Sequence, residues 1–222
     1  DDDIVVGLAA RLYPVKGIDT LIKAAKIVLE HNPRVKFVIG GDGEDRKSLE
    51  RKAASLGISD SVFFLGWLND PYELMSNVDI SVLTSISESF PYSVLEGARF
   101  KKATISSNVG GIPDLIDHGK SGYLFNPGDY RKLAEYILEL AADKGKREAM
   151  GENIFQKASS RFSLENMCKT QLDIYRAILE KKPEEKAANW NYDVVISGYY
   201  GFKNIGDDAM LMAIIDNLRM YK

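Results

Sequence analysis

The sequence is poor in the side chains that most often make disulfides and metal sites. It has one cysteine, Cys168, and two histidines among 222 residues. A single cysteine excludes an internal disulfide framework and is typical of a reducing compartment, so we expect a cytoplasmic protein. Two histidines and one cysteine do not make a usual zinc site, and we expect no bound metal. Cys168 itself is expected to be a small core residue on a helix.

The sequence also lacks a basic excess and a long hydrophobic run. Its formal net charge is −3, which gives no attraction to nucleic acid or to an anionic membrane. The apolar run Ile4–Ala10 falls far short of the ~18 residues that a membrane-spanning helix needs. Asp1–Asp3 differs from the basic start of a signal peptide. No initiator methionine precedes it, and we expect the chain to be a piece of a longer protein.

Short β-branched runs alternate with helical patterns over the first 125 residues. The runs predict strands at Ile4–Ala10, Val35–Ile39, Val62–Leu65, Val78–Leu83, Thr104–Ser106 and Gly122–Phe125. The intervening patterns predict helices at Ile18–Leu29, Ser48–Leu56, Tyr72–Met75, Tyr92–Phe100 and Ile112–Ile116. Continuous apolar strands between helices predict a Rossmann-like α/β fold, in which a parallel six-stranded sheet carries helices on both faces.

The chain changes character after Asp129. Helical patterns predict three helices at about Tyr130–Asp143, Lys146–Ser160 and Leu164–Lys182. The charged stretch that follows contains a proline and no apolar period, so residues 183–191 are expected to be a linker. Residues 192–222 predict one strand, a glycine-rich loop and a helix. We therefore expect a domain at 1–182 and the truncated start of a second α/β domain at 192–222.

The predicted topology brings charged residues of distant segments together. Open parallel sheets bind ligands beyond the carboxyl ends of their strands, where the strand order reverses, here between the first and fourth strands. Arg11 and Lys16 on the first of these loops suit phosphate, and a carboxylate such as Glu96 suits vicinal diols. A nucleotide sugar requires both features. Gly40–Gly43 is interpreted as a turn, because it lacks the lysine and hydroxyl of a nucleotide-hydrolase loop.

Several motifs then occur together in one order. Seven residues separate Glu88 from Glu96, and around them stand Ala10-Arg11-Leu12, Lys16-Gly17, Gly40-Gly41-Asp42-Gly43, Phe64-Leu65-Gly66, Gly110-Gly111-Ile112-Pro113 and Gly122-Tyr123-Leu124-Phe125. As a set over about residues 4–180 they resemble the E-x7-E region of retaining glycosyltransferases of family 4. The resemblance implies the donor-binding, C-terminal half of a GT-B fold. Lys101-Lys102-Ala103 and Asp114 depart from the usual pattern.

The resemblance implies a role for each site residue. Arg11 and Lys16 would neutralise the donor diphosphate and Glu88 would contact the donor sugar, so these three are the catalytic candidates. Glu96 would hold the ribose hydroxyls. The remaining donor-binding candidates are Phe90, Pro91, Tyr92, Gly66, Trp67, Gly110 and Gly111. The implied reaction transfers a sugar, with retention, from a nucleotide-diphosphate sugar to a glycan or lipid-linked acceptor in cell-surface polysaccharide synthesis. No essential metal or other cofactor is implied.

The resemblance also implies parts that the sequence lacks. An N-terminal domain would supply the acceptor site and any peripheral membrane contact, so this chain alone is expected to be inactive or weakly active. Tyr192–Arg219 resembles the start of polysaccharide pyruvyl transferases, which implies a fusion of two enzymes of surface polysaccharide synthesis.

Two other functions stay open at this point. A non-catalytic nucleotide-sugar-binding or scaffold module would keep the same pocket. A dinucleotide-dependent oxidoreductase is disfavoured because Ala9-Ala10-Arg11, and no G-x-G-x-x-G motif, follows the first strand. The nucleotide base, the sugar, the acceptor and the oligomeric state are not determined by the sequence.

Overall fold

The computed structural model describes residues 3–89 and 91–180. Phe90, the expected linker at 183–191 and the expected second unit at 192–222, with its pyruvyl transferase-like motif, lie outside the described residues. The chain divides into two units, Asp1–Leu172 and Asp173–Lys222, and the boundary falls inside the last described helix. The sheet and the pocket described below belong to the first unit.

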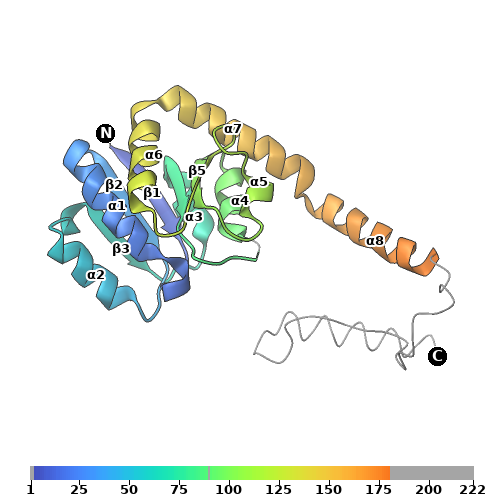
Figure 1. The fold of residues 1–222 in the computed structure, drawn as a ribbon, viewed down its shortest axis with the longest axis horizontal. Helices are drawn as coiled ribbons and strands as arrows, with labels where there is room; N and C mark the ends of the chain where they lie inside the picture. Colours follow the sequence, from blue (N-terminus) through green and yellow to red (C-terminus); the bar gives the residue numbers. More distant parts are fainter. Residues whose placement is uncertain (1–2, 90, 181–222) are drawn as a thin grey trace. The chain divides into compact units, whose positions relative to one another are not determined.

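The first unit is built on a six-stranded sheet (Figure 1). Its strands are β1 (Ile4–Ala9), β2 (Val35–Gly40), β3 (Val62–Gly66), β4 (Ile80–Leu83), β5 (Ala103–Ser107) and β6 (Tyr123–Phe125). They lie in the order β3-β2-β1-β4-β5-β6, and every neighbouring pair is parallel. The predicted fold is confirmed, and the order reverses between β1 and β4.

Helices connect the strands and continue after the sheet. They are α1 (Ile18–His31), α2 (Arg46–Ser55), α3 (Pro71–Asn77), α4 (Tyr92–Arg99), α5 (Ile112–Leu115), α6 (Tyr130–Ala142), α7 (Lys144–Arg161) and α8 (Leu164–Glu180), with short 3-10 turns η1 (Pro14–Lys16) and η2 (Ser59–Ser61). These bounds differ from the predicted ones by a few residues at the ends of most elements.

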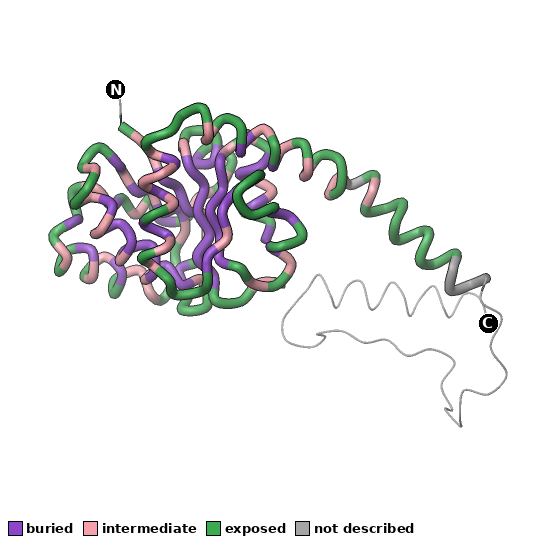
Figure 2. Tube along the Cα trace, turned by 45° about the horizontal axis from the view of Figure 1, so that its top comes forward, coloured by how far each residue is buried: buried purple, intermediate pink, exposed green. Residues whose placement is uncertain are grey.

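Alternate residues of the strands pack under different helices, as the two-residue period of a strand requires. Val6 and Leu8 of β1 belong to a core cluster that also contains buried residues of α1, α2 and α6. Val5 and Ala9 of the same strand pack with Leu74 of α3. A third cluster joins the end of β4 to α4, α5 and α7. Helices therefore cover both faces of the sheet, and the strands form the buried centre (Figure 2).

One local expectation needs correction. Cys168 is exposed and not part of the core, and its neighbours Met167 and Leu172 on α8 are exposed as well. The apolar character of these residues predicts a buried face, but no described element covers this part of α8. The helix after β4 begins at Tyr92, where the sequence predicts its start, with Pro91 as its N-cap.

Candidate functional site

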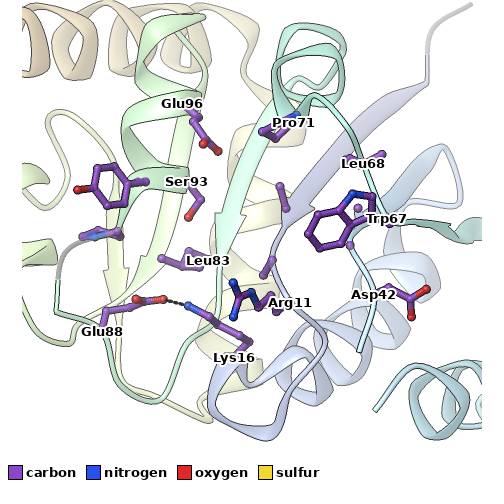
Figure 3. Close-up of a pocket in the computed structure, with 16 residues that line it drawn as sticks. Arg11, Lys16, Asp42, Trp67, Leu68, Pro71, Leu83, Glu88, Ser93 and Glu96 are labelled. Atoms are coloured by element: carbon purple, nitrogen blue, oxygen red, sulfur yellow. Dashed lines mark hydrogen bonds and ion pairs between the residues drawn. The ribbon is translucent and has the colours of Figure 1, made fainter. Parts of the chain in front are cut away.

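A pocket of about 600 Å³ opens at the carboxyl ends of β1 and β4, where the strand order reverses (Figure 3). This is the position at which open parallel sheets bind their ligands. The residues that line it are Ala9, Ala10, Arg11, Lys16, Gly40, Gly41, Asp42, Trp67, Leu68, Pro71, Leu83, Glu88, Pro91, Tyr92, Ser93 and Glu96. The segments that follow four different strands, β1, β2, β3 and β4, thus meet in one cavity.

One end of the pocket holds a cation–carboxylate pair. Lys16 Nζ lies 2.5 Å from Glu88 Oε1, and the two side chains are 25% and 12% exposed. Figure 3 shows the two side chains pointing toward one another across the gap between the loops after β1 and β4. Because both groups are largely shielded from water, their attraction is stronger than that of a surface ion pair.

Arg11 adds a second cation to this end of the pocket. It follows β1 directly and lines the pocket with an exposed side chain. The guanidinium group presents a planar set of donors, which matches phosphate oxygens. Arg11 and Lys16 therefore give the pocket an anion-binding end.

Glu96 occupies the opposite end of the pocket in Figure 3. It lies in α4, and burial of its half-buried carboxyl raises its pKa above the usual value, with a further contribution from the negative charge of Asp70. Desolvation makes the ionised carboxylate costly in the absence of a donor partner. A ligand that brings hydroxyl donors to Glu96 would supply hydrogen bonds to that carboxylate.

Two aromatic rings border the pocket with most of their surface in solvent. Trp67, after β3, is 70% exposed and Tyr92, at the start of α4, is 72% exposed. Large exposed aromatic side chains contribute little to a core, but they provide flat surfaces on which a nucleobase can stack. The wall formed by Trp67 is thus suited to a planar ligand group.

The structure brings most of the predicted site residues together. Arg11, Lys16, Glu88, Glu96, Pro91, Tyr92 and Trp67 all line the pocket. Gly66, Gly110 and Gly111 are described but are not among the lining residues, and Phe90 lies outside the description.

Gly110 lies directly beneath the backbone of Glu88. Its φ of 54° is in the left-handed region, and a Cβ at this position would lie 1.7 Å from the carbonyl oxygen of Glu88. The amide of the next residue, Gly111, donates to the carbonyl of Ser89 at 3.2 Å. The two glycines thus let the loop after β5 support the loop that carries Glu88.

The sequence did not identify the wall formed by the loop after β2. Gly40, Gly41 and Asp42 line the pocket, although Gly40–Gly43 is interpreted above as a turn. Gly41 has φ 126°, and a Cβ there would lie 1.9 Å from the carbonyl oxygen of Ala10. The strand order could have revealed this wall, because β2 is the neighbour of β1.

The described part of the chain contains neither a cluster of metal ligands nor a membrane-spanning helix. In that part of the chain, no three His, Cys, Asp or Glu side chains gather as ligands for a metal ion. None of its helices combines the length and the apolar character needed to cross a bilayer.

A sequence profile described as "Glycosyl transferases group 1" matches residues 1–157, which is well over half of the chain. The chain belongs to this family. CapM of Staphylococcus aureus, a capsular polysaccharide biosynthesis glycosyltransferase, is 26% identical over 182 residues, which are 82% of this chain and 48% of CapM. This chain spans about half the length of the curated relatives it matches.

Solved structures of glycosyltransferases have the same fold. HepE of Anabaena in complex with UDP superposes with a TM-score of 0.75 at 28% identity over 79% of this chain and 49% of that one. The C-terminal domain of a group 1 glycosyltransferase, LpcC of Francisella tularensis, superposes with a TM-score of 0.67 at 26% identity, and 87% of that domain is covered by 72% of this chain. The chain therefore has the α/β fold of one half of a GT-B glycosyltransferase.

Proposed function

We propose that this chain is the donor-binding domain of a retaining glycosyltransferase that takes its sugar from a nucleotide-diphosphate sugar. The observation that carries the proposal is the distribution of charge in one pocket at the β1/β4 reversal. Arg11 and Lys16 lie at one end and the half-buried Glu96 lies at the other. A nucleotide sugar carries a diphosphate and a ribose diol, and this pocket offers a complementary group to each.

The two cations suit the chemistry of the leaving group. As the glycosidic bond breaks, negative charge grows on the departing diphosphate, so a cation stabilises the transition state more than the bound substrate. Each charge-assisted hydrogen bond contributes about 1.5–3 kcal/mol. We therefore assign diphosphate neutralisation to Arg11 and Lys16, and expect this to work without an essential metal ion.

The remaining donor contacts follow from the positions around the pocket. Glu88, held between the loops after β1 and β4, is assigned to the donor sugar. Glu96 is assigned to the ribose hydroxyls and Trp67 to one face of the base. The relative HepE was crystallised with UDP, which supports a uridine nucleotide as the first donor to test.

The transfer reaction as a whole requires more than this chain. We propose that the other half of the protein supplies the acceptor site and any peripheral membrane contact, and that the acceptor is a glycan or lipid-linked molecule of cell-surface polysaccharide synthesis in the cytoplasm. The relative CapM, whose name refers to capsular polysaccharide, supports the choice of pathway. The chain alone is expected to transfer sugar poorly or not at all.

Titration calorimetry on the chain tests the donor assignment. UDP, GDP and ADP, and a sugar conjugate of each, are titrated in the presence of EDTA, and we expect at least one to bind in the millimolar range or more tightly. Arg11→Ala should weaken that binding about tenfold or more, whereas Arg161→Ala at the end of α7 should leave it unchanged. Absence of binding by all six ligands would show the assignment to be wrong. Turnover of a radiolabelled donor by the full-length protein distinguishes an enzyme from a non-catalytic binding module.

A further inference from the structure

The hydroxyl of Ser85 is buried directly against the carboxylate of Glu88. Ser85 is 0% exposed, and its Oγ donates to Glu88 Oε1 at 2.7 Å. The same oxygen accepts from Lys16 Nζ at 2.5 Å. Two donors from different loops thus converge on one carboxylate oxygen and fix the direction in which the carboxylate points.

Ser85 is itself held from the neighbouring strand. The hydroxyl of Ser107, at the end of β5, donates to the carbonyl oxygen of Ser85 at 2.6 Å, and Ser107 is also 0% exposed. Because β5 pairs with β4, this bond ties the first residues after β4 to the sheet. A chain of two buried hydroxyls therefore connects the sheet to Glu88.

Thr84, the residue before Ser85, holds the backbone of Lys16, which is the other member of the ion pair with Glu88. The hydroxyl of Thr84, which is fully buried, donates to the backbone carbonyl of Lys16 at 2.9 Å. The amide of Ile86 donates to the carbonyl of Val15 at 2.8 Å. The segment 84–86 thus fixes the position of the Lys16 backbone and of the Glu88 side chain relative to each other.

We propose that Ser85 is a positioning residue that orients the Glu88 carboxylate toward the sugar of a bound nucleotide sugar, with Ser107 fixing Ser85 in turn. The inference rests on the proposed function, in which Glu88 contacts the donor sugar. Without the Ser85 hydroxyl, Lys16 is the one donor that the described contacts leave to Glu88 Oε1. The carboxylate then gains rotational freedom, and its contact with the sugar is lost while the diphosphate contacts remain.

The test measures how much the sugar adds to nucleotide binding. UDP and UDP-glucose, with GDP and GDP-mannose as a second pair, are titrated into the chain, and the ratio of the nucleotide Kd to the nucleotide-sugar Kd is recorded. Ser85→Ala should lower this ratio about tenfold and leave the Kd of the bare nucleotide within about twofold. Ser81→Ala is the matched control. Ser81 lies on β4 and is buried like Ser85, but its hydroxyl donates to Met75 and not to Glu88.

A double-mutant cycle separates positioning from a structural effect. Because Ser85 acts through Glu88, adding Ser85→Ala to Glu88→Ala should not lower the ratio further. An equal loss for both ligands of a pair, or the same loss of ratio in the Glu88→Ala background, would overturn the role of Ser85 while leaving the proposed function intact. If the unaltered chain binds only ADP and its sugar conjugate, that pair replaces the other two in the test. Failure to bind any of the six ligands would overturn the proposed function and, with it, this inference.

Discussion

Lys16 Nζ and Glu88 Oε1 are 2.5 Å apart, although the two residues are 72 positions apart in the sequence. Their contact exists because parallel strands β1 and β4 are neighbours and deliver their carboxyl-terminal loops to the same edge of the sheet. The carboxylate of Glu88 therefore pairs with the same ammonium group that we assign to the donor diphosphate. A phosphate that binds Lys16 competes with Glu88 for it.

This competition predicts opposite effects of Glu88→Gln on binding and on transfer. The substitution removes a negative charge from the anion-binding end while retaining the shape of the side chain, so UDP should bind about three- to tenfold more tightly at low salt. Transfer by the full-length protein should fall about 100-fold or more, because the proposed sugar contact is lost.

Calorimetry at two ionic strengths checks the binding half of this prediction. The increase in UDP affinity caused by Glu88→Gln should become smaller as the salt concentration rises, because it is electrostatic. Glu148→Gln on α7, whose carboxylate pairs with Lys144 away from the pocket, is the control and should leave UDP affinity unchanged. Weaker UDP binding by Glu88→Gln would contradict the competition between Glu88 and phosphate.

Glu96 should make the stability of the protein depend on pH. Burial raises the pKa of this carboxyl in the folded protein above its ordinary value of 4.5, so the folded state retains the proton at a pH at which the unfolded state has lost it. Stability therefore falls as pH rises through the range above 4.5, and the cost persists at neutral pH. Glu96→Gln removes that cost and should raise Tm at pH 7 by about 1–4 °C.

The same substitution should weaken ligand binding. A carboxylate accepts strong hydrogen bonds from a ribose diol, and an amide accepts weaker ones, so nucleotide affinity should fall about tenfold in Glu96→Gln and further in Glu96→Ala. Thermal unfolding at pH 4 and pH 7 and nucleotide titration at pH 7 check the two halves. An equal rise in Tm of Glu96→Gln at both pH values would contradict the pH-dependent cost of the Glu96 carboxylate. An unchanged nucleotide affinity would contradict its contact with the ribose hydroxyls.

Much of this site could be predicted because the order of the strands determines which loops lie side by side. Arg11 and Glu88 are placed together by the strand order alone. The alternation of apolar runs and helical patterns predicts a parallel sheet, and the common order of six-stranded parallel sheets then places the reversal between the first and fourth strands. The wall made by Gly41 was missed because a glycine turn and a ligand-binding loop have the same composition. Its role depends on the approach of its backbone to Ala10, which no local pattern encodes.

Ser85 and Cys168 show a different limit. Serine is common in loops, and nothing in the sequence distinguishes Ser85, which donates to Glu88 from a fully buried position, from an ordinary turn residue. Cys168 has the character of a core residue but is exposed on α8. In both cases the outcome depends on which distant segment lies against the residue, and composition does not carry that information.

Two glycines of α7 should respond in opposite ways to alanine. A Cβ on Gly151 would lie 1.9 Å from the carbonyl oxygen of Lys101, which is backbone and cannot move aside. Gly145→Ala meets its nearest atom, Asp143 Oδ1, at an ordinary 3.5 Å. Since alanine favours a helix over glycine by about 1 kcal/mol, Gly145→Ala should stabilise the protein by up to about 1 kcal/mol.

Gly151→Ala should instead destabilise by about 1–3 kcal/mol, because the overlap with Lys101 outweighs the helix preference. Urea unfolding of the two variants checks the signs, and each variant is the other's control for the helix-propensity effect. If both substitutions stabilised the protein, the close packing of α7 on the turn before β5 would be refuted.

Trp67 should contribute to ligand binding and hardly at all to stability. Its side chain is 70% exposed, so truncation leaves no core cavity, and Trp67→Ala should change Tm by less than about 1 °C. If its ring stacks on the base, the same substitution should cost about 1–3 kcal/mol of nucleotide binding, which is roughly 5- to 150-fold in Kd. Trp67→Phe should retain much of the affinity because it keeps an aromatic face.

Comparison of UDP with inorganic diphosphate separates base stacking from other effects: the loss of affinity in Trp67→Ala should appear for UDP and be absent for diphosphate. An equal loss for both ligands would mean that Trp67 shapes the pocket and does not contact the base.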